Sequence, residues 1–378
     1  MFKRNKKPSV ILDLDNTTAN KRKKFPRLRA WVQRHKKLSI ALLIITVLLV
    51  ACGTATAIYF LNQKPEETIT VKKSKPPVPE PVHYYSPLTG AEVENEAITK
   101  QAATAIMIEN SPDARPQSGL KNSGVVFEAI AEGGITRFLA LYQEQKPQLI
   151  GPVRSVRMYY VDWLAAFNAS VAHIGGSAAA LAEVRNGTYR DIDQFFNAGA
   201  YWRASDRYAP HNVYTSFERL DALNTAKGYT TSSFTGFTRK DSAANPTPNA
   251  TAVNVSISSA LYNSSYAYDA ATNTYNRSQG GAPHLDREEG QISPRVVIVM
   301  KVNETTVMED GARQNIQAVG SGTGYIFQDG LAQEITWSKA SRADQIKFTD
   351  ATGADVPLAR GQTWITSVPA STGGVTWQ

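Results

Sequence analysis

The stretch VVFEAIAEGGITRFLALY, residues 125–142, decides the fold of the larger part of the chain. It holds two apolar runs, 125–130 and 137–142, whose β-branched and aromatic residues predict two buried strands. The pair Gly133-Gly134 between them allows the positive φ angles that a tight turn needs. The runs TAIMIE at 104–109 and SVAHI at 170–174 predict further strands of the same kind.

Helices are predicted after these strands. Residues 158–168 place Tyr159, Trp163 and Phe167 on one face at helical spacing. Residues 178–185 follow Ser177, a suitable N-cap, and precede Gly187, which is typical of a helix end. Because strands alternate with helices, we expect an α/β domain at residues 84–237.

The pattern changes after residue 254. Segments such as VSISSALYNSSYAYD (255–269) alternate polar and apolar residues, as strands with one solvated face do. Gln328-Asp329-Gly330 separates two such runs and is typical of a hairpin turn. We therefore expect a mainly antiparallel β domain at residues 255–378, joined to the first by a polar linker at residues 238–254 that contains two prolines.

An apolar segment near the N-terminus predicts a membrane anchor. Residues 38–61, LSIALLIITVLLVACGTATAIYFL, contain no charge, and as a helix they are long enough for a bilayer core of roughly 30 Å. The basic tail before it, residues 1–37, has 13 Lys/Arg and 2 Asp/Glu, which holds that end in the cytoplasm. The chain should cross the cytoplasmic membrane once, with its bulk outside, followed by a stiff proline-rich linker at residues 62–83.

Two forms of this anchor are open. Leu49-Val50-Ala51-Cys52 resembles a bacterial lipobox, in which Cys52 would become the lipidated N-terminus after cleavage. The apolar run continues for nine residues past Cys52 and the basic tail is long, which favours an uncleaved signal anchor.

Composition excludes several classes of protein. The whole chain has 41 Lys/Arg and 33 Asp/Glu, so residues 38–378 hold 28 basic and 31 acidic residues and offer no general nucleic-acid surface. Cys52 is the only cysteine, which excludes a disulfide framework and a Cys-based zinc site. No P-loop lysine or dinucleotide fingerprint occurs, and we predict no cofactor.

Several long motifs resemble those of the YerB-like bacterial envelope lipoproteins. They are NSPDARPQSGL (110–120), VVFEAIAEGGITRFLALY (125–142), IGPVRSVRMYYVDW (150–163), HIGGS (173–177), APHNVYTS (209–216), YNRSQGGAPHLD (275–286), GSGTGYIFQDG (320–330) and GQTWI (361–365). The similarity covers most of residues 86–369 in the same order. It implies a two-domain extracytoplasmic protein and no particular reaction.

Charged residues concentrate around the first strand pair. Glu128, Glu132 and Arg137 belong to it, and Arg154 and Arg157 stand just ahead of the predicted helix. A guanidinium group fits phosphate and carboxylate, so one hypothesis is an anion site whose arginines the glutamates orient. The alternative is a structural network of ion pairs.

The HIGGS loop is a second candidate anion site. Gly175, Gly176 and Ser177 lie between a predicted strand and a predicted helix, where free backbone N–H groups and the helix dipole attract anions. The alternative is a tight packing turn.

Three histidines are candidate site residues. His211 could act as a general acid or base with Asp206 or Glu128 orienting it, and its loop neighbours Arg207 and Asn212 could bind the ligand. The alternative is a structural hydrogen bond across the loop. His173 is a second acid–base candidate, and His284 with Asp286 could bind a ligand in the second domain. None has the spacing of a metal motif such as HExxH, so no metal site is predicted.

These residues support two main hypotheses. The first is a binding module for an anionic cell-wall polymer or a lipid-linked pyrophosphate, using Arg137, Arg154, Arg157 and the HIGGS loop. The second is an envelope hydrolase or transferase in which His211 or His173 moves protons and Glu128 or Glu132 assists. A scaffold for unidentified protein partners is a third. The recurrence of arginines, without an acid–base motif, favours binding.

Overall fold

The structure, a computed structural model, describes residues 31–63, 82–306 and 313–378. The chain divides into two compact units, Met1–Pro79 and Glu80–Gln378. Most of the predicted basic tail (1–30) and of the predicted proline-rich linker (64–81) lies outside the described residues.

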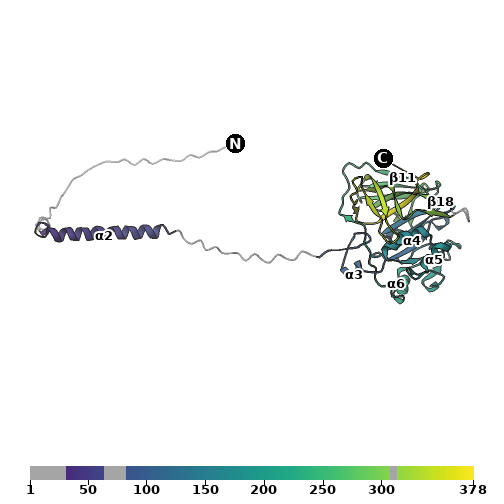
Figure 1. The fold of residues 1–378 in the computed structure, drawn as a ribbon, viewed down its shortest axis with the longest axis horizontal. Helices are drawn as coiled ribbons and strands as arrows, with labels where there is room; N and C mark the ends of the chain where they lie inside the picture. The colour runs from purple at the N-terminus through teal and green to yellow at the C-terminus, as the bar shows by residue number, and fades with distance from the viewer. Residues whose placement is uncertain (1–30, 64–81, 307–312) are drawn as a thin grey trace, which may run out of the picture. The chain divides into compact units, whose positions relative to one another are not determined.

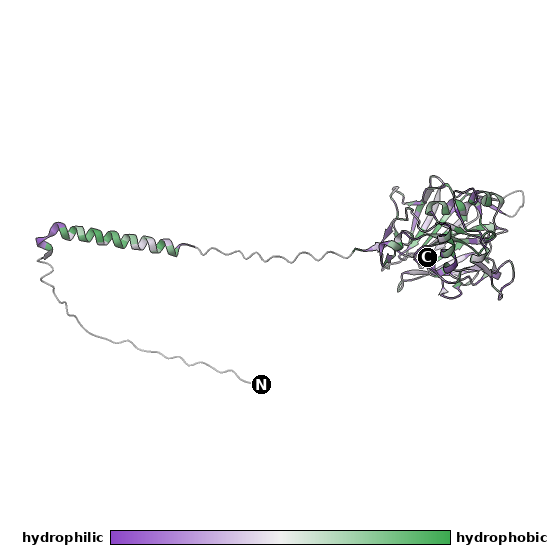
Figure 2. Cartoon of the chain, turned by 90° about the horizontal axis from the view of Figure 1, so that it is seen from below, coloured by the Kyte–Doolittle hydropathy of each residue, from purple (hydrophilic) through white to green (hydrophobic). Residues whose placement is uncertain are grey.

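The first unit contains helix α2 (Lys36–Leu61), which has 26 residues. Among the described residues it is the one helix long and apolar enough to cross a membrane, and Figure 2 shows apolar residues along much of its length. At 1.5 Å per residue it is about 39 Å long, more than the bilayer core of about 30 Å. Cys52 lies inside this helix.

The second unit is built on one large sheet that contains strands from both halves of the chain. Its order is β22 (Lys347–Thr349), β21 (Leu331–Lys339), β20 (Gly320–Gln328), β17 (Val296–Val302), β24 (Thr363–Pro369), β4 (Val125–Glu132), β5 (Ile135–Tyr142), β3 (Thr104–Glu109), β6 (Ser170–Ala172) and β7 (Arg190–Asp191). Strand β24 makes the join, because it pairs in parallel with β17 on one side and with β4 on the other. Figure 1 shows the two halves, blue to teal and green to yellow, packed into one body.

A second sheet belongs to the C-terminal half alone. Its five strands are antiparallel, in the order β14 (Ala282–Pro283), β13 (Thr274–Gln279), β12 (Ser264–Asp269), β11 (Ala252–Ser256) and β25 (Gly374–Trp377). Smaller helices are α3 (Glu96–Thr99), α6 (Phe217–Ala226) and four short 3-10 helices (Pro112–Ala114, Leu120–Asn122, Ala165–Phe167, Ala198–Ala200). Short strands also form separate pairs in the described residues. These pairs are β1–β2 (Tyr84–Tyr85, Glu92–Val93), β8–β9 (Tyr201–Arg203, Val213–Thr215), β10–β23 (Arg239–Lys240, Leu358–Ala359), β15–β16 (Leu285–Asp286, Gly290–Gln291) and β18–β19 (Glu304–Thr306, Gln314–Ile316).

Both faces of the large sheet are covered, which explains why its central strands are mostly apolar. On β4, Val125 and Phe127 join a core with helices α4 (Met158–Leu164) and α5 (Ala178–Val184), while Val126 and Ile130 join a core with the five-stranded sheet. The predicted fold class, an α/β N-terminal part followed by a mainly antiparallel β part, is confirmed.

Local details follow the sequence closely. Strand β3 spans the six predicted residues, and the predicted helix 158–168 is α4 continued by a 3-10 turn that ends at Asn168, where φ is 47°. Asp329 (φ 59°) and Gly330 (φ 78°) form the predicted turn between β20 and β21. The expected linker, 238–254, contains β10 and the start of β11. The predicted domain boundaries at 237 and 255 stay predictions.

Candidate functional site

Four strands of the large sheet end at one edge with charged or titratable residues. β3, β4, β6 and β7 run in the same direction, because β3 is parallel to β6, β6 is parallel to β7, and β3 and β4 are both antiparallel to β5. Glu109 ends β3, Glu132 ends β4, Asp191 ends β7 and His173 follows β6. Ligand sites of α/β proteins commonly lie at this carboxyl edge.

Segment 150–157, IGPVRSVR, crosses this edge and carries two of the predicted arginines. Its backbone is bonded to β3, where the N–H of Arg154 donates to the carbonyl of Met107 at 2.8 Å. It is also bonded to the loop after β6, where the N–H of Val156 donates to the carbonyl of Gly175 at 3.0 Å. These bonds fix the arginines over the strand ends.

Glu132 holds Arg137 and Arg157 in one ion-pair network. Its two oxygens accept hydrogen bonds from Nη2 of Arg137 and Nη2 of Arg157, each at 2.7 Å. Burial acts to raise the pKa of Glu132, but the two guanidinium groups outweigh burial and lower it. The Arg137 side chain is only 2% exposed. Both arginines are thus engaged with the protein, as the structural alternative expected.

Glu128 does not join this network. A register shift between Ile130 and Glu132 interrupts the regular alternation of β4, so the two glutamates serve opposite faces of the sheet. Glu128 is fully buried and accepts hydrogen bonds from Nη2 of Arg277 (2.8 Å) and Nε1 of Trp364 (2.9 Å). The two glutamates expected to act together are therefore separated, and Glu128 is out of reach of solvent.

His284 and Asp286, expected to bind a ligand, are both buried, and His284 contacts Arg277, the partner of Glu128. Nδ1 of His284 accepts a hydrogen bond from Nη1 of Arg277, and Nε2 lies 2.9 Å from Oε1 of Gln117. Burial, and then Arg277 and Arg115, hold the pKa of His284 well below its usual value. The ring is therefore neutral and donates from Nε2. The Asp286 carboxylate accepts backbone N–H groups of Lys121, Glu288 and Glu289.

His173 is also fully buried, with a partner on each ring nitrogen. Nδ1 lies 2.8 Å from the carbonyl oxygen of Gly175, and Nε2 lies 3.0 Å from Oδ1 of Asp191. His173, Asp191 and Asp193 offer ligand atoms within 4.8 Å of one another, which is close enough to hold a metal ion. Arg185 already supplies a cation there, because its Nη2 donates to Asp193 at 2.5 Å.

The HIGGS loop does not present the donors that an anion site needs. The N–H of Gly175 points at Oδ1 of Asp193 at 3.5 Å, and the N–H of Ser177 donates to the carbonyl of Val156 at 3.2 Å. The predicted strand–loop–helix pattern is present, but α5 has only seven residues. Of the anion site predicted at Gly175, Gly176 and Ser177, two N–H groups are thus already taken by the protein's own acceptors.

His211 is the predicted acid–base residue that reaches a cavity. Its Nδ1 lies 2.8 Å from Oε1 of Glu109 and 3.2 Å from Oγ of Ser111. Nε of Arg154 lies 3.5 Å from the same Glu109 oxygen. Glu109 is almost fully buried, and its Oε2 has no hydrogen-bond partner within the described residues.

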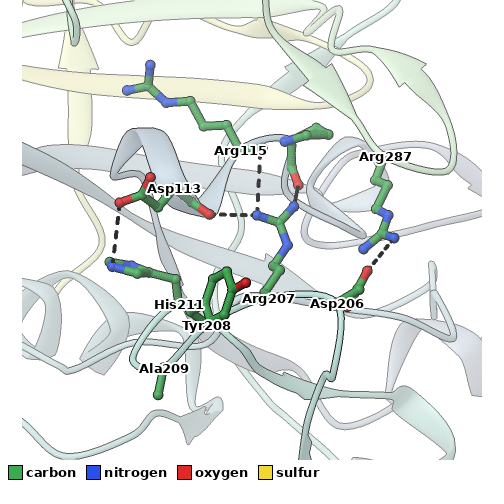
Figure 3. A pocket seen from close by; sticks show the side chains of 9 residues that line it. Asp113, Arg115, Asp206, Arg207, Tyr208, Ala209, His211 and Arg287 are labelled. Atoms are coloured by element: carbon green, nitrogen blue, oxygen red, sulfur yellow. Dashed lines mark hydrogen bonds and ion pairs between the residues drawn. The ribbon is translucent and has the colours of Figure 1, made fainter.

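The cavity beside His211 has a volume of about 700 Å³ and lies between the loops at 113–116 and 206–211, with Arg287 contributed by a third segment (Figure 3). Arg207 ties the loops together, because its guanidinium donates to the carbonyl oxygens of Asp113 (2.8 Å) and Pro116 (2.6 Å). Asn212 supports the second loop through hydrogen bonds to Arg203 and Ala204. The lining residues are Asp113, Arg115, Pro116, Asp206, Arg207, Tyr208, Ala209, His211 and Arg287.

Arginines outnumber carboxylates in this lining. Arg287 is paired with Asp206 at 2.6 Å, and this hydrogen bond lowers the pKa of Asp206. Arg115 donates to Asn110 and Arg207 donates to backbone carbonyls, and neither forms an ion pair with a carboxylate in the described parts of the chain. The cavity therefore carries a net positive charge.

The partner of His211 was predicted wrongly. Asp206 and Glu128 were the expected partners, but Asp206 faces Arg287, Glu128 is buried elsewhere, and Glu109 takes the place. One feature of the sequence could have pointed to Glu109, because it is the acidic residue that ends the apolar run TAIMIE. Its contact with His211, 102 positions later, has no local signature.

Known proteins match this chain along most of its length. Two family models, the N-terminal and C-terminal domains of a protein of unknown function (DUF3048), match residues 88–230 and 253–365. YerB of Bacillus subtilis (strain 168) is 32% identical over 339 residues, which are 87% of this chain and 94% of YerB. A crystal structure of YerB from Bacillus subtilis is similar with a TM-score of 0.70 and 30% identity, over 78% of this chain and 99% of that chain. The resemblance read from the motifs is confirmed, and the chain belongs to the two-domain, YerB-like DUF3048 family.

Proposed function

We propose that this chain is a membrane-anchored protein of the bacterial cell envelope that binds an anionic ligand in the cavity beside His211. Helix α2 supports the anchor, and so does the relative YerB, whose name classes it as a candidate lipoprotein. The basic residues ahead of α2 favour an N-terminus in the cytoplasm and residues 80–378 outside. In the lipidated form of the anchor, Cys52 carries the lipid.

One observation carries the ligand proposal. Three arginines and two aspartates line the cavity, and Arg115 and Arg207 have no carboxylate partner in the described segments. Excess positive charge in a concave surface attracts anions, and guanidinium groups suit phosphate. Arg137 and Arg157 share the Glu132 carboxylate in the protein's own ion-pair network, so the binding role expected of them passes to the three arginines of the cavity.

The ligand class is a phosphate-bearing component of the envelope, either an anionic cell-wall polymer or a lipid-linked pyrophosphate. Tyr208 supports this class, because it lines the cavity, is 90% exposed as a residue and offers an aromatic ring to the sugar or lipid part of such a molecule.

The test is calorimetric titration of pyrophosphate into the full chain, held in nanodiscs of zwitterionic lipid. We expect Arg287→Gln to weaken binding about tenfold, as the loss of one charged contact does. Arg342→Gln is the matched control, because Arg342 is 41% exposed against 40% for Arg287 and also pairs with carboxylates, Asp162 and Glu183.

Binding should also weaken as salt rises, since the contact is electrostatic and part-exposed. If Arg287→Gln and Arg342→Gln bind pyrophosphate with equal affinity, the cavity is not the binding site. If pyrophosphate produces no heat with any of the chains, the protein-interaction scaffold becomes the better hypothesis.

A further inference from the structure

We propose that this cavity is catalytic, with His211 as the proton acceptor and donor in hydrolysis of a phosphodiester and Glu109 as its positioning residue. The inference rests on the proposed function, because it requires the anion to bind beside His211. Catalysis, in addition to binding, is inferred from the tautomer in which the structure holds the imidazole of His211.

Glu109 sets the tautomer of His211. Its Oε1, 2.8 Å from Nδ1, is a carboxylate oxygen and can only accept, so Nδ1 must carry a proton. In a neutral ring Nε2 then has a free lone pair. The nearest carboxylate to Nε2 is that of Asp113, with Oδ2 at 3.9 Å, which is beyond hydrogen-bond distance, and the Asp113 side chain is 82% exposed. Figure 3 shows this edge of the ring turned toward Asp113 at the cavity.

The other histidines of the second unit differ in this respect. His173 and His284 are buried and have a partner on each ring nitrogen, so neither ring can take a proton from a ligand. His83 forms a similar pair, with Nδ1 2.5 Å from Oε1 of Glu92, but both side chains are more than half exposed. Among the described residues, only His211 combines a buried carboxylate on Nδ1 with an Nε2 that faces a cavity.

The surroundings of the pair suit proton transfer. Arg154 lies 3.5 Å from Oε1 of Glu109, and Ser111 donates to the same oxygen at 3.0 Å, so the carboxylate that orients His211 is itself held in place. When His211 becomes an imidazolium ion, the buried Glu109 carboxylate stabilises the new charge. A preorganised base of this kind is typical of acid–base catalysis.

The reaction balances with water as the only co-reactant. Nε2 of His211 takes a proton from a water molecule as the water oxygen forms a new bond to phosphorus. The bond between phosphorus and the leaving oxygen breaks, and the imidazolium returns its proton to that oxygen. The products are a phosphomonoester and an alcohol. Arg207 and Arg287 line the same cavity and offset the charge of the phosphate.

The first experiment measures nitrophenol release from bis(p-nitrophenyl) phosphate by the full chain in nanodiscs. We expect His211→Gln to lower kcat at least a hundredfold and to leave pyrophosphate affinity within threefold. Glu109→Gln should lower kcat about tenfold and change the pH profile, because an amide no longer selects one tautomer. His83→Gln, which breaks the exposed His–Glu pair, is the matched control and should match the wild type.

A second readout needs no substrate. Diethyl pyrocarbonate acylates accessible imidazole nitrogens, and mass spectrometry assigns the product to each histidine. We expect His211 to react, pyrophosphate to protect it, and Glu109→Gln to slow the reaction. His173 and His284 should stay unmodified in the folded chain and report any unfolding of a variant.

The outcomes separate the two proposals. Pyrophosphate binding without nitrophenol release, equal turnover in the wild type and His211→Gln, or an unreactive His211 would overturn the catalytic proposal and leave the binding function standing. Absence of both binding and turnover would overturn both.

Discussion

Replacing Arg277 with methionine is expected to destabilise the second unit by about 4 kcal/mol. Arg277 is fully buried, and its guanidinium bonds Glu128 at 2.8 Å, Gln279 at 3.1 Å and Tyr266 at 3.2 Å. Without it, the buried Glu128 carboxylate keeps only neutral donors, such as Trp364. Removing one partner of a buried ion pair costs about 3–5 kcal/mol, because the remaining charge is left without compensation. Urea unfolding of the full chain in detergent, followed by tryptophan fluorescence, measures the change.

The double variant Glu128→Gln/Arg277→Met tests the physical reason. It removes both charges, so we expect it to recover about half of the loss, and the effects of the two single substitutions should not add. Arg342→Met is the control, because its ion pairs are part-exposed and should contribute at most about 1 kcal/mol. A loss below about 1 kcal/mol for Arg277→Met, or a double variant no more stable than that single variant, would refute the reasoning.

Three further predictions concern pH and the anchor. The folded chain holds the pKa of His284 well below the unfolded value of about 6.5, so the unfolded chain binds a proton that the folded chain rejects. The free energy of unfolding should therefore fall by up to about 1.4 kcal/mol per pH unit below pH 6.5. In urea titrations from pH 7 to 5, His284→Gln should show a smaller change of this free energy with pH than the wild type. Equal changes in the two proteins would contradict this. Burial raises the pKa of Glu304 to about 7, so the folded chain keeps a proton that the unfolded chain releases, and stability is lost as the pH rises toward 7. Glu304→Gln should gain about 1 kcal/mol at pH 8, a value reduced for its partial exposure, and almost nothing at pH 4.5; thermal unfolding with the same gain at both pH values would count against this. Cys52→Ala should stay in the membrane fraction, because α2 alone is long enough to span the bilayer; its release would show that a lipid on Cys52 is the anchor.

Strands with two buried faces were predictable because their signal is local. β3 and residues 138–142 of β5 are mostly apolar runs, which can be recognised without knowledge of the strands that they pair with. The turn at Asp329-Gly330 was equally readable, since few residue pairs adopt two positive φ angles. The sharing of one sheet by both halves had no such signal, because it depends on β24 meeting β4.

The site was predictable only in its residue types. His211 was identified as an acid–base candidate from its chemistry, but its partner Glu109 is 102 positions away. A spacing of four puts Glu128 and Glu132 on the same face of a regular strand, but the register shift after Ile130 places them on opposite faces. The HIGGS loop had the local form of an anion site, but Asp193 and Val156 reach its N–H groups from other parts of the chain.

Because β24 lies near the end of the chain, the large sheet can be completed only late in folding. β4 finds its first neighbour, β5, within a few residues, but its second neighbour is almost the last strand of the chain, and Glu128 meets Trp364 across 236 positions. Until β24 reaches β4, the N-terminal half keeps an open strand edge that can pair with another partly folded chain. A premature stop between the two halves would therefore yield an aggregating fragment, and a gene cut at residue 250 should not give two soluble proteins.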